Sequence, residues 1–145
     1  MIMDRTGLLS DGQAITASAA STNITDLGAT GTPYGSSVAL TRDIGNAEVP
    51  LVVTVTESFN NLTSLSIQIQ TSVDAAFTSP VVAYQSPTYT LAQLATSAKY
   101  LLPDDFPVGT SQRYVRLFYT VVGTAPTLGR LTSGVVASRQ KNRRY

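Results

Sequence analysis

Short segments in which apolar and polar residues alternate dominate the chain. The clearest one spans residues 62–70, where leucine and isoleucine alternate with serine and glutamine. A period of two places alternate side chains on opposite faces of a β-strand, so this segment is predicted to be a strand with one buried face. Residues 51–56 alternate in the same way, and Asn60-Asn61 between the two segments predicts a β-hairpin.

Further strands are predicted where apolar or β-branched residues cluster between turn signals such as Asp11-Gly12. About eight short antiparallel strands separated by turns are typical of a β-sandwich or jelly roll. We therefore expect an all-β domain over residues 1–138, with an extended N-terminal segment, followed by a basic tail at residues 139–145. The additional strand segments are residues 38–41, 81–86, 113–122 and 131–138, with weaker candidates at 14–19 and 24–27.

One short helix is expected as a connection between strands. Apolar residues between Leu91 and Ala98 recur at helical spacing. Thr90 precedes them in the N-cap position, and Gln93 follows three residues later, which is the pattern of a capping box.

The composition removes most catalytic chemistries. The 145 residues include no cysteine and no histidine, and charged residues make up only 13%. Disulfides, thiolate or imidazole metal sites and Ser-His-Asp or Cys-His nucleophiles are therefore excluded. Neither the GxGxxG nor the GxxxxGKS/T phosphate-binding motif occurs. We expect a non-enzymatic protein with no cofactor, no metal and no small-molecule substrate.

Carboxylates are the remaining catalytic candidates. Asp104-Asp105 is the only adjacent acidic pair, and its place between two prolines predicts a turn. Glu48, Glu57 and Asp74 leave a carboxylate-based hydrolase open, but no spacing among them selects the facing pair that a glycosidase needs. We expect these side chains to be solvated surface charges.

Positive charge is concentrated at the end of the chain. Residues 1–138 contain six basic and nine acidic residues, a net charge of −3, whereas the last seven residues carry four basic side chains. This tail is either a frayed terminus, a docking element for a protein or a contact for phosphates. Nucleic acid is the least expected partner because the body is acidic and has no nucleic-acid-binding motif. The predicted contact residues of the tail are Arg139, Lys141, Arg143, Arg144 and Tyr145.

Two further segments are candidates for partner contacts. The leading segment Met1–Leu9, which contains Arg5, is expected to extend from the sandwich and to order on a partner. In strand 113–122, one face is apolar and the other carries Tyr114, Arg116 and Phe118. This mixed face indicates either a central strand covered on both sides or a subunit interface, where aromatic residues and arginine are enriched.

Sequence motifs near both ends carry a family resemblance. Residues 113–129, RYVRLFYTVVGTAPTLG, look like the YxRLxYxVxGTxPTxG hairpin near the end of small phage capsid proteins. Residues 130–136, RLTSGVV, are similar to the closing strand of that family. Residues 9–28, LSDGQAITASAASTNITDLG, resemble the family's opening, roughly LSDxQAxTxxAxSTNxIDLG. On these motifs the chain is similar to the capsid cement, or decoration, proteins of tailed bacteriophages.

This resemblance implies a jelly-roll protein of the virion that clamps the outer capsid surface. It implies the major capsid protein as a partner, and self-association as a homodimer or a higher cluster. Because we find no signal peptide and no membrane span in the sequence, we expect synthesis in the host cytoplasm and no membrane partner.

Two alternatives remain open at this point. One is a different phage structural role, such as a head–tail or tail-decoration protein. The other is a carbohydrate-binding β-sandwich that uses exposed aromatic side chains as a platform. Candidates for such a platform are tyrosines such as Tyr34, Tyr84, Tyr89 or Tyr114.

Overall fold

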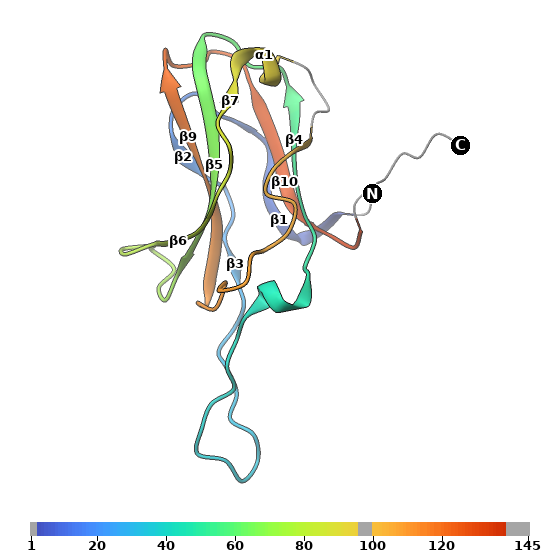
Figure 1. The fold of residues 1–145 in the computed structure, drawn as a ribbon, viewed down its shortest axis with the longest axis vertical. Helices are drawn as coiled ribbons and strands as arrows, with labels where there is room; N and C mark the ends of the chain where they lie inside the picture. The colour runs from blue at the N-terminus through green and yellow to red at the C-terminus, as the bar shows by residue number, and fades with distance from the viewer. Residues whose placement is uncertain (1–2, 96–99, 139–145) are drawn as a thin grey trace, which may run out of the picture.

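The fold is a two-sheet β-sandwich, seen in a computed structural model that describes residues 3–95 and 100–138 (Figure 1). One sheet has the strand order β1-β10-β4-β8. All of its strand pairs are antiparallel. Its strands are β1 (Met3–Ala14), β10 (Arg130–Val136), β4 (Leu51–Glu57) and β8 (Tyr100–Leu101).

The second sheet has the order β2-β9-β5-β6, and two short strands extend it: β3 pairs with β9, and β7 pairs with β5. The long β5–β9 ladder at its centre runs from Leu62 opposite Gly123 to Ser72 opposite Tyr114. The expected all-β sandwich is therefore confirmed. The strands are β2 (Ala19–Ala20), β3 (Thr25–Asp26), β5 (Leu62–Ser72), β6 (Val81–Gln85), β7 (Tyr89–Thr90) and β9 (Tyr114–Gly123).

The core lies between the two sheets and is built from the apolar faces of their long strands. The predicted alternation in β5 holds, because Leu65, Ile67 and Ile69 are fully buried. One buried polar group stands among them: the hydroxyl of Tyr119 lies 2.8 Å from Ser10 Oγ and 2.9 Å from Ser133 Oγ. These bonds tie β9 to both β1 and β10, and burial raises the pKa of Tyr119. The other fully buried residues of this core include Leu51, Val53, Val55, Val115, Leu117 and Leu131.

The predicted hairpin at Asn60-Asn61 is wrong, because β4 and β5 belong to different sheets. The chain turns this corner with Asn61 in a left-handed conformation (φ 62°). Asn60 Oδ1 accepts hydrogen bonds from the backbone N–H groups of Thr127 and Leu128, both at 2.9 Å. A turn signal marks where a strand ends, but it does not say whether the next strand stays in the same sheet.

The segment 113–136 also differs from the expected hairpin. β9 lies in the second sheet and β10 in the first, so the GTAPTLG connection crosses between them. Gly129 makes the crossing possible: its φ is +131°, and a Cβ there would lie 2.3 Å from Phe59 Cδ1. Only glycine satisfies both the conformation and the close approach of that ring.

The start of the chain is a strand rather than a free extension. β1 pairs with β10 from Met3 opposite Val136 to Ala14 opposite Arg130, so the expectation that residues 1–9 leave the sandwich is wrong for the described residues 3–9. Asp11-Gly12 is not a turn between strands either. Gly12 has a φ of +53° inside β1, where the register shifts, so the pair bends a continuous strand.

The predicted strand at residues 38–41 is absent, since this segment carries no strand pairing. It belongs to a long connection between β3 and the short 3-10 helix Ile44–Ala47, and this connection projects beyond the lower end of the sandwich in Figure 1. We call residues 29–41 the arm.

The helix α1 (Leu91–Leu94) lies between β7 and β8 as expected. The capping box is confirmed, and the Thr90 N–H donates to Gln93 Oε1 at 2.9 Å. Ala98, the last residue of the predicted helical pattern, is outside the described residues. Within the described ranges, no helix has the length and apolar character needed to cross a membrane.

Candidate interaction surfaces

The structure places four of the nine predicted contact residues. Arg5 is exposed on β1, and Tyr114, Arg116 and Phe118 are half-buried on β9. The tail residues predicted to bind a partner all lie outside the described residues, so their role stays a prediction: Arg139, Lys141, Arg143, Arg144 and Tyr145.

Tyr114, Arg116 and Phe118 share one face of β9, and they point away from the core because the residues between them are buried. β9 is central in its sheet, but among the described residues no third layer of strands covers this face. Phe77, from the loop after β5, packs here: the Arg116 guanidinium lies 4.1 Å from the Phe77 ring centroid and 5.8 Å from that of Phe118.

A row of amide side chains holds Arg116 in place across three strands. Arg116 Nε donates to Gln70 Oε1 at 2.9 Å, and Gln70 Nε2 donates to Gln68 Oε1 at 2.8 Å. Gln68 Nε2 then donates to Gln85 Oε1 at 2.7 Å. Burial lowers the pKa of Arg116, but an arginine remains charged at neutral pH. The face therefore presents a fixed cation between two aromatic rings.

Two exposed valines share the outward face with Arg116, Val82 beside its partner Gln70 and Val122 further along β9. Val82 on β6 is paired with Gln70, and Val122 on β9 is paired with Ser64, so both belong to the same face of the sheet. They are 47% and 52% exposed. We call this surface, formed by the outward residues of β9, β5 and β6 together with Phe77, the outer sheet face. Aromatic residues and arginine among apolar and amide side chains are the usual composition of a protein interface.

The arm is the second surface. Its tip is a β-turn in which the Ser36 N–H donates to the Pro33 carbonyl at 3.0 Å and Gly35 has a φ of +79°. The two sides of the arm meet where the Leu40 N–H donates to the Gly31 carbonyl at 2.9 Å. Tyr34 at the tip is fully exposed.

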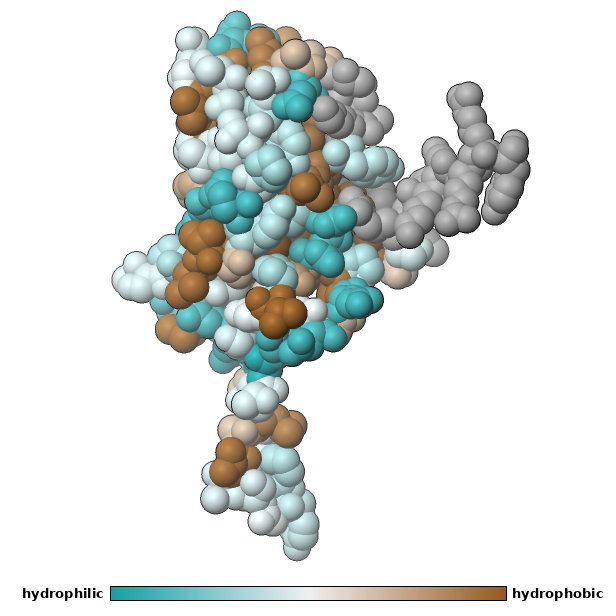
Figure 2. Space-filling view, in the orientation of Figure 1, coloured by the Kyte–Doolittle hydropathy of each residue, from teal (hydrophilic) through white to brown (hydrophobic). Residues whose placement is uncertain are grey.

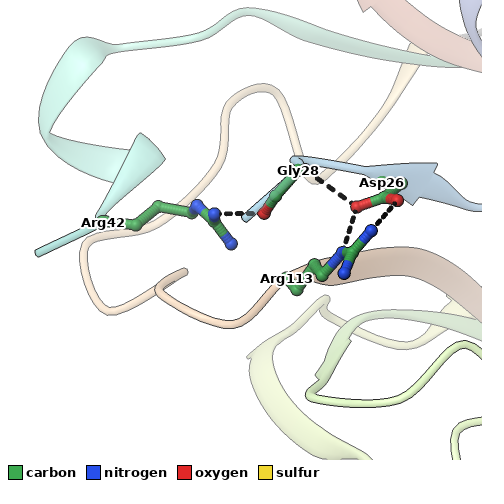
Figure 3. A network of polar contacts seen from close by, with 4 residues as sticks. All are labelled: Asp26, Gly28, Arg42 and Arg113. Atoms are coloured by element: carbon green, nitrogen blue, oxygen red, sulfur yellow. Dashed lines mark hydrogen bonds and ion pairs between the residues drawn. The ribbon is translucent and has the colours of Figure 1, made fainter. Parts of the chain in front are cut away.

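The base of the arm is held by a network of polar contacts (Figure 3). Arg113, immediately before β9, binds both carboxylate oxygens of Asp26, at 2.7 and 2.8 Å. Asp26 Oδ1 also accepts the Gly28 N–H at 2.8 Å, and Arg42 Nη2 donates to the Gly28 carbonyl. Mainly because of the bonds from Arg113, the pKa of Asp26 falls to about 2.

A hollow of about 370 Å³ lies beside this network. Arg42, Arg113, Gln112 and Val73 are among its lining residues. Gln112 Oε1 is buried and has no hydrogen-bond partner within the described part of the chain. Asp26 offsets the charge of Arg113, so Arg42 supplies the positive charge of this hollow.

Sequence reasoning missed the arm as a surface. The sequence predicts a strand at residues 38–41, whereas Val38 and Leu40 lie in the arm and are 71% and 59% exposed. One signal for the arm was present: residues 29–41 contain no charged side chain and begin with the turn signal Gly31-Thr32-Pro33.

Three of the acidic candidates, Asp104, Asp105 and Glu57, take part in structural contacts. Asp104-Asp105 is not in a turn: the Asp104 carbonyl accepts the Leu51 N–H at 2.9 Å, and Asp105 pairs with Pro50 next to β4. Glu57 forms an ion pair with Arg130 at 3.2 Å. Across residues 3–95 and 100–138, no group of three or more potential metal ligands comes together.

The tyrosines expected to form a carbohydrate platform are also dispersed. Tyr89 is buried, and its hydroxyl accepts the Leu102 N–H at 2.8 Å. Tyr34 stands at the tip of the arm, and Tyr114 lies on the outer sheet face. Tyr84 on β6 is paired with Ile69 and packs against the core. The four residues therefore do not present a common aromatic surface.

Fold and surfaces together define an all-β sandwich with two exposed faces suited to protein contacts. The chain belongs to the Bbp16 family, whose model matches residues 9–136. The matched region contains the arm and the outer sheet face, but neither Arg5 nor the basic tail. No curated protein matches the chain.

Proposed function

We propose that this chain is a structural protein of a phage particle that binds the outer surface of the capsid and stabilises contacts between major capsid protein subunits. The cement-protein resemblance of residues 9–28 and 113–136 supports this role. The second of these segments includes β9, the strand that presents Tyr114, Arg116 and Phe118 on the outer sheet face.

The observation that carries the proposal is the fixed position of Arg116 between Phe77 and Phe118. A side chain that is already ordered loses little conformational entropy when a partner covers it. Arginine and aromatic residues at the centre of an interface supply much of its binding energy. We infer that a protein partner covering the outer sheet face would lose little binding energy to the ordering of Arg116.

The physical basis of the role is linkage. A protein that binds only across assembled subunits stabilises the assembled shell by mass action. Many copies on a symmetric lattice add to this effect through avidity. Such binding needs a complementary surface rather than a titrating or nucleophilic side chain. We further propose that the chain acts as a homodimer or a higher cluster on that lattice.

Heating of shells tests the proposal. Purified protein is added to parent-phage shells that lack it, and disruption of the shells is followed by light scattering against temperature. We expect the protein to co-sediment with the shells and to raise their disruption temperature, with saturation at a fixed ratio to the capsid subunit. Co-sedimentation with tails but not with shells would contradict the proposal and favour the head–tail or tail role.

A further inference from the structure

We infer that the arm is a second docking element, which inserts Tyr34 into an uncharged, apolar depression on a shell subunit next to the one that the outer sheet face covers. This inference rests on the proposed function and names the partner of a separate surface. The exposure of the arm is its starting point: Tyr34, Val38 and Leu40 are all exposed large apolar residues within one short segment. Figure 2 shows apolar residues standing on the arm among pale, weakly polar ones.

The arm is internally braced although it lies outside the core. Pro33 and the left-handed Gly35 define the turn that presents Tyr34, and the Gly31–Leu40 hydrogen bond closes the segment behind it. Both ends are fixed at the base, because Arg42 binds the Gly28 carbonyl and Asp26 binds the Gly28 N–H. A loop that is held in one conformation binds with a smaller loss of conformational entropy.

The composition of the arm indicates the chemistry of its partner. Residues 29–41 consist of glycine, serine, threonine, alanine, proline, valine and leucine around a single tyrosine. Tyrosine with serine and glycine is the composition of antibody loops that bind proteins, where the tyrosine is a rigid anchor and the small residues adapt around it. An arm without a positive charge lacks the lysine and arginine contacts that supply most of the affinity for phosphates, so the partner is a neutral protein surface and not nucleic acid.

The position of the arm indicates that its partner is a neighbouring subunit of the shell. Arg113 joins the two surfaces: it binds Asp26 at the base of the arm, and its guanidinium lies 5.0 Å from the Tyr114 ring on the outer sheet face. The arm extends beyond the end of the sandwich, so its tip reaches past the area that the body covers (Figure 1). A protein that strengthens a seam must contact both sides of it, and an arm of this kind supplies the second contact.

The test uses the full-length protein with Tyr34→Ala, and Tyr100→Ala as a matched control. Tyr100 is also an exposed tyrosine, 48% exposed, but it lies on β8 in the other sheet. Because neither ring is in the core, we expect both variants to melt as the wild type does. We expect Tyr34→Ala to weaken binding to shells that lack the protein by about tenfold or more, as for an anchor residue, and Tyr100→Ala to leave it unchanged.

A photoreactive phenylalanine analogue at position 34 identifies the occupant. We expect a cross-link to the major capsid protein in decorated shells. A cross-link to a second copy of this chain, or to DNA, would overturn the inference. Equal shell binding by wild type and Tyr34→Ala would overturn the inference and leave the proposed function standing, whereas wild-type protein that does not bind shells would overturn both.

Discussion

The guanidinium of Arg116 lies over the ring of Phe77, 4.1 Å from its centroid, although Arg116 lies on β9 and Phe77 in the loop after β5. This contact fixes a charged side chain on a face that no further strand among the described residues covers. The same guanidinium is tied through Gln70 to the amide row that crosses β5 and β6. The outer sheet face thus has a defined centre, and its variants test the proposed interface.

Replacement of Arg116 by alanine is expected to weaken binding to shells by about tenfold, because it removes the central cation and leaves Phe77 without its partner. The free energy of unfolding should fall by only about 1 kcal/mol, since an arginine over an aromatic ring contributes modestly in a partly exposed position. Co-sedimentation and urea unfolding measure the two effects. Arg130→Ala is the matched control, because Arg130 is an arginine of the other sheet in an exposed ion pair. If both variants bind shells equally well, the outer sheet face is not the interface.

Gly129 is expected to tolerate no side chain. Gly129→Ala would place a Cβ 2.3 Å from Phe59 Cδ1 at a φ of +131°, so the connection between the sheets must shift. We expect a loss of about 2–4 kcal/mol in the free energy of unfolding, measured with urea. Gly31→Ala is the control: nothing lies within 4 Å of its added Cβ, and we expect a change of less than about 0.5 kcal/mol. Equal free energies of unfolding for the two variants would show that the chain at Gly129 can accommodate a Cβ beside the Phe59 ring.

The hydroxyl of Tyr119 is expected to stabilise the core through its bonds to Ser10 and Ser133. Tyr119→Phe leaves buried serine hydroxyls with fewer partners and should reduce the free energy of unfolding by about 1–3 kcal/mol. Ser133→Ala added to Tyr119→Phe should recover part of this loss, because it removes one of the unpaired groups. A double variant whose losses simply add would show that the two hydroxyls do not interact.

The Asp26–Arg113 pair predicts a pH dependence at the base of the arm. The pKa of Asp26 falls from 3.8 to about 2 in the folded protein, so folding favours its ionised form. The stabilisation is present above about pH 4 and is lost as the pH falls through 2. The difference in unfolding free energy between wild type and Asp26→Asn should therefore be constant from pH 5 to 7 and smaller at pH 2. Urea unfolding across this range measures it, and a difference that is the same at pH 2 as at pH 6 would contradict the assignment.

The sequence predicts the positions of the strands better than it predicts which strands pair with each other. In β5 the alternation identifies the apolar residues that face the core, Leu65, Ile67 and Ile69, but not the burial of Ser64 and Gln70 on the opposite face. The pairing of β4 with β10 rather than β5 depends on contacts between distant segments. The corner between β4 and β5 is an example. Asn60-Asn61 signals a turn in the sequence, but Asn60 Oδ1 holds the corner by accepting hydrogen bonds from the distant Thr127 and Leu128.

The candidate surfaces were predictable to different degrees. Tyr114, Arg116 and Phe118 stand out by alternation along one strand, but their partner Phe77 comes from a loop that no local pattern connects to them. The arm was misinterpreted because Val38 and Leu40 suit a strand, yet a strand also needs a neighbour for its backbone. Here no neighbouring strand is present in the described chain, so these side chains stay exposed.

A reconstruction of the parent particle by electron microscopy tests the central claim most directly. We expect density for this sandwich on the outer surface of the shell, in copy numbers set by the capsid symmetry, with the outer sheet face against one capsid subunit and Tyr34 against the next. Density for the chain only at the portal or the tail, or its absence from the particle, would rule out the proposed role.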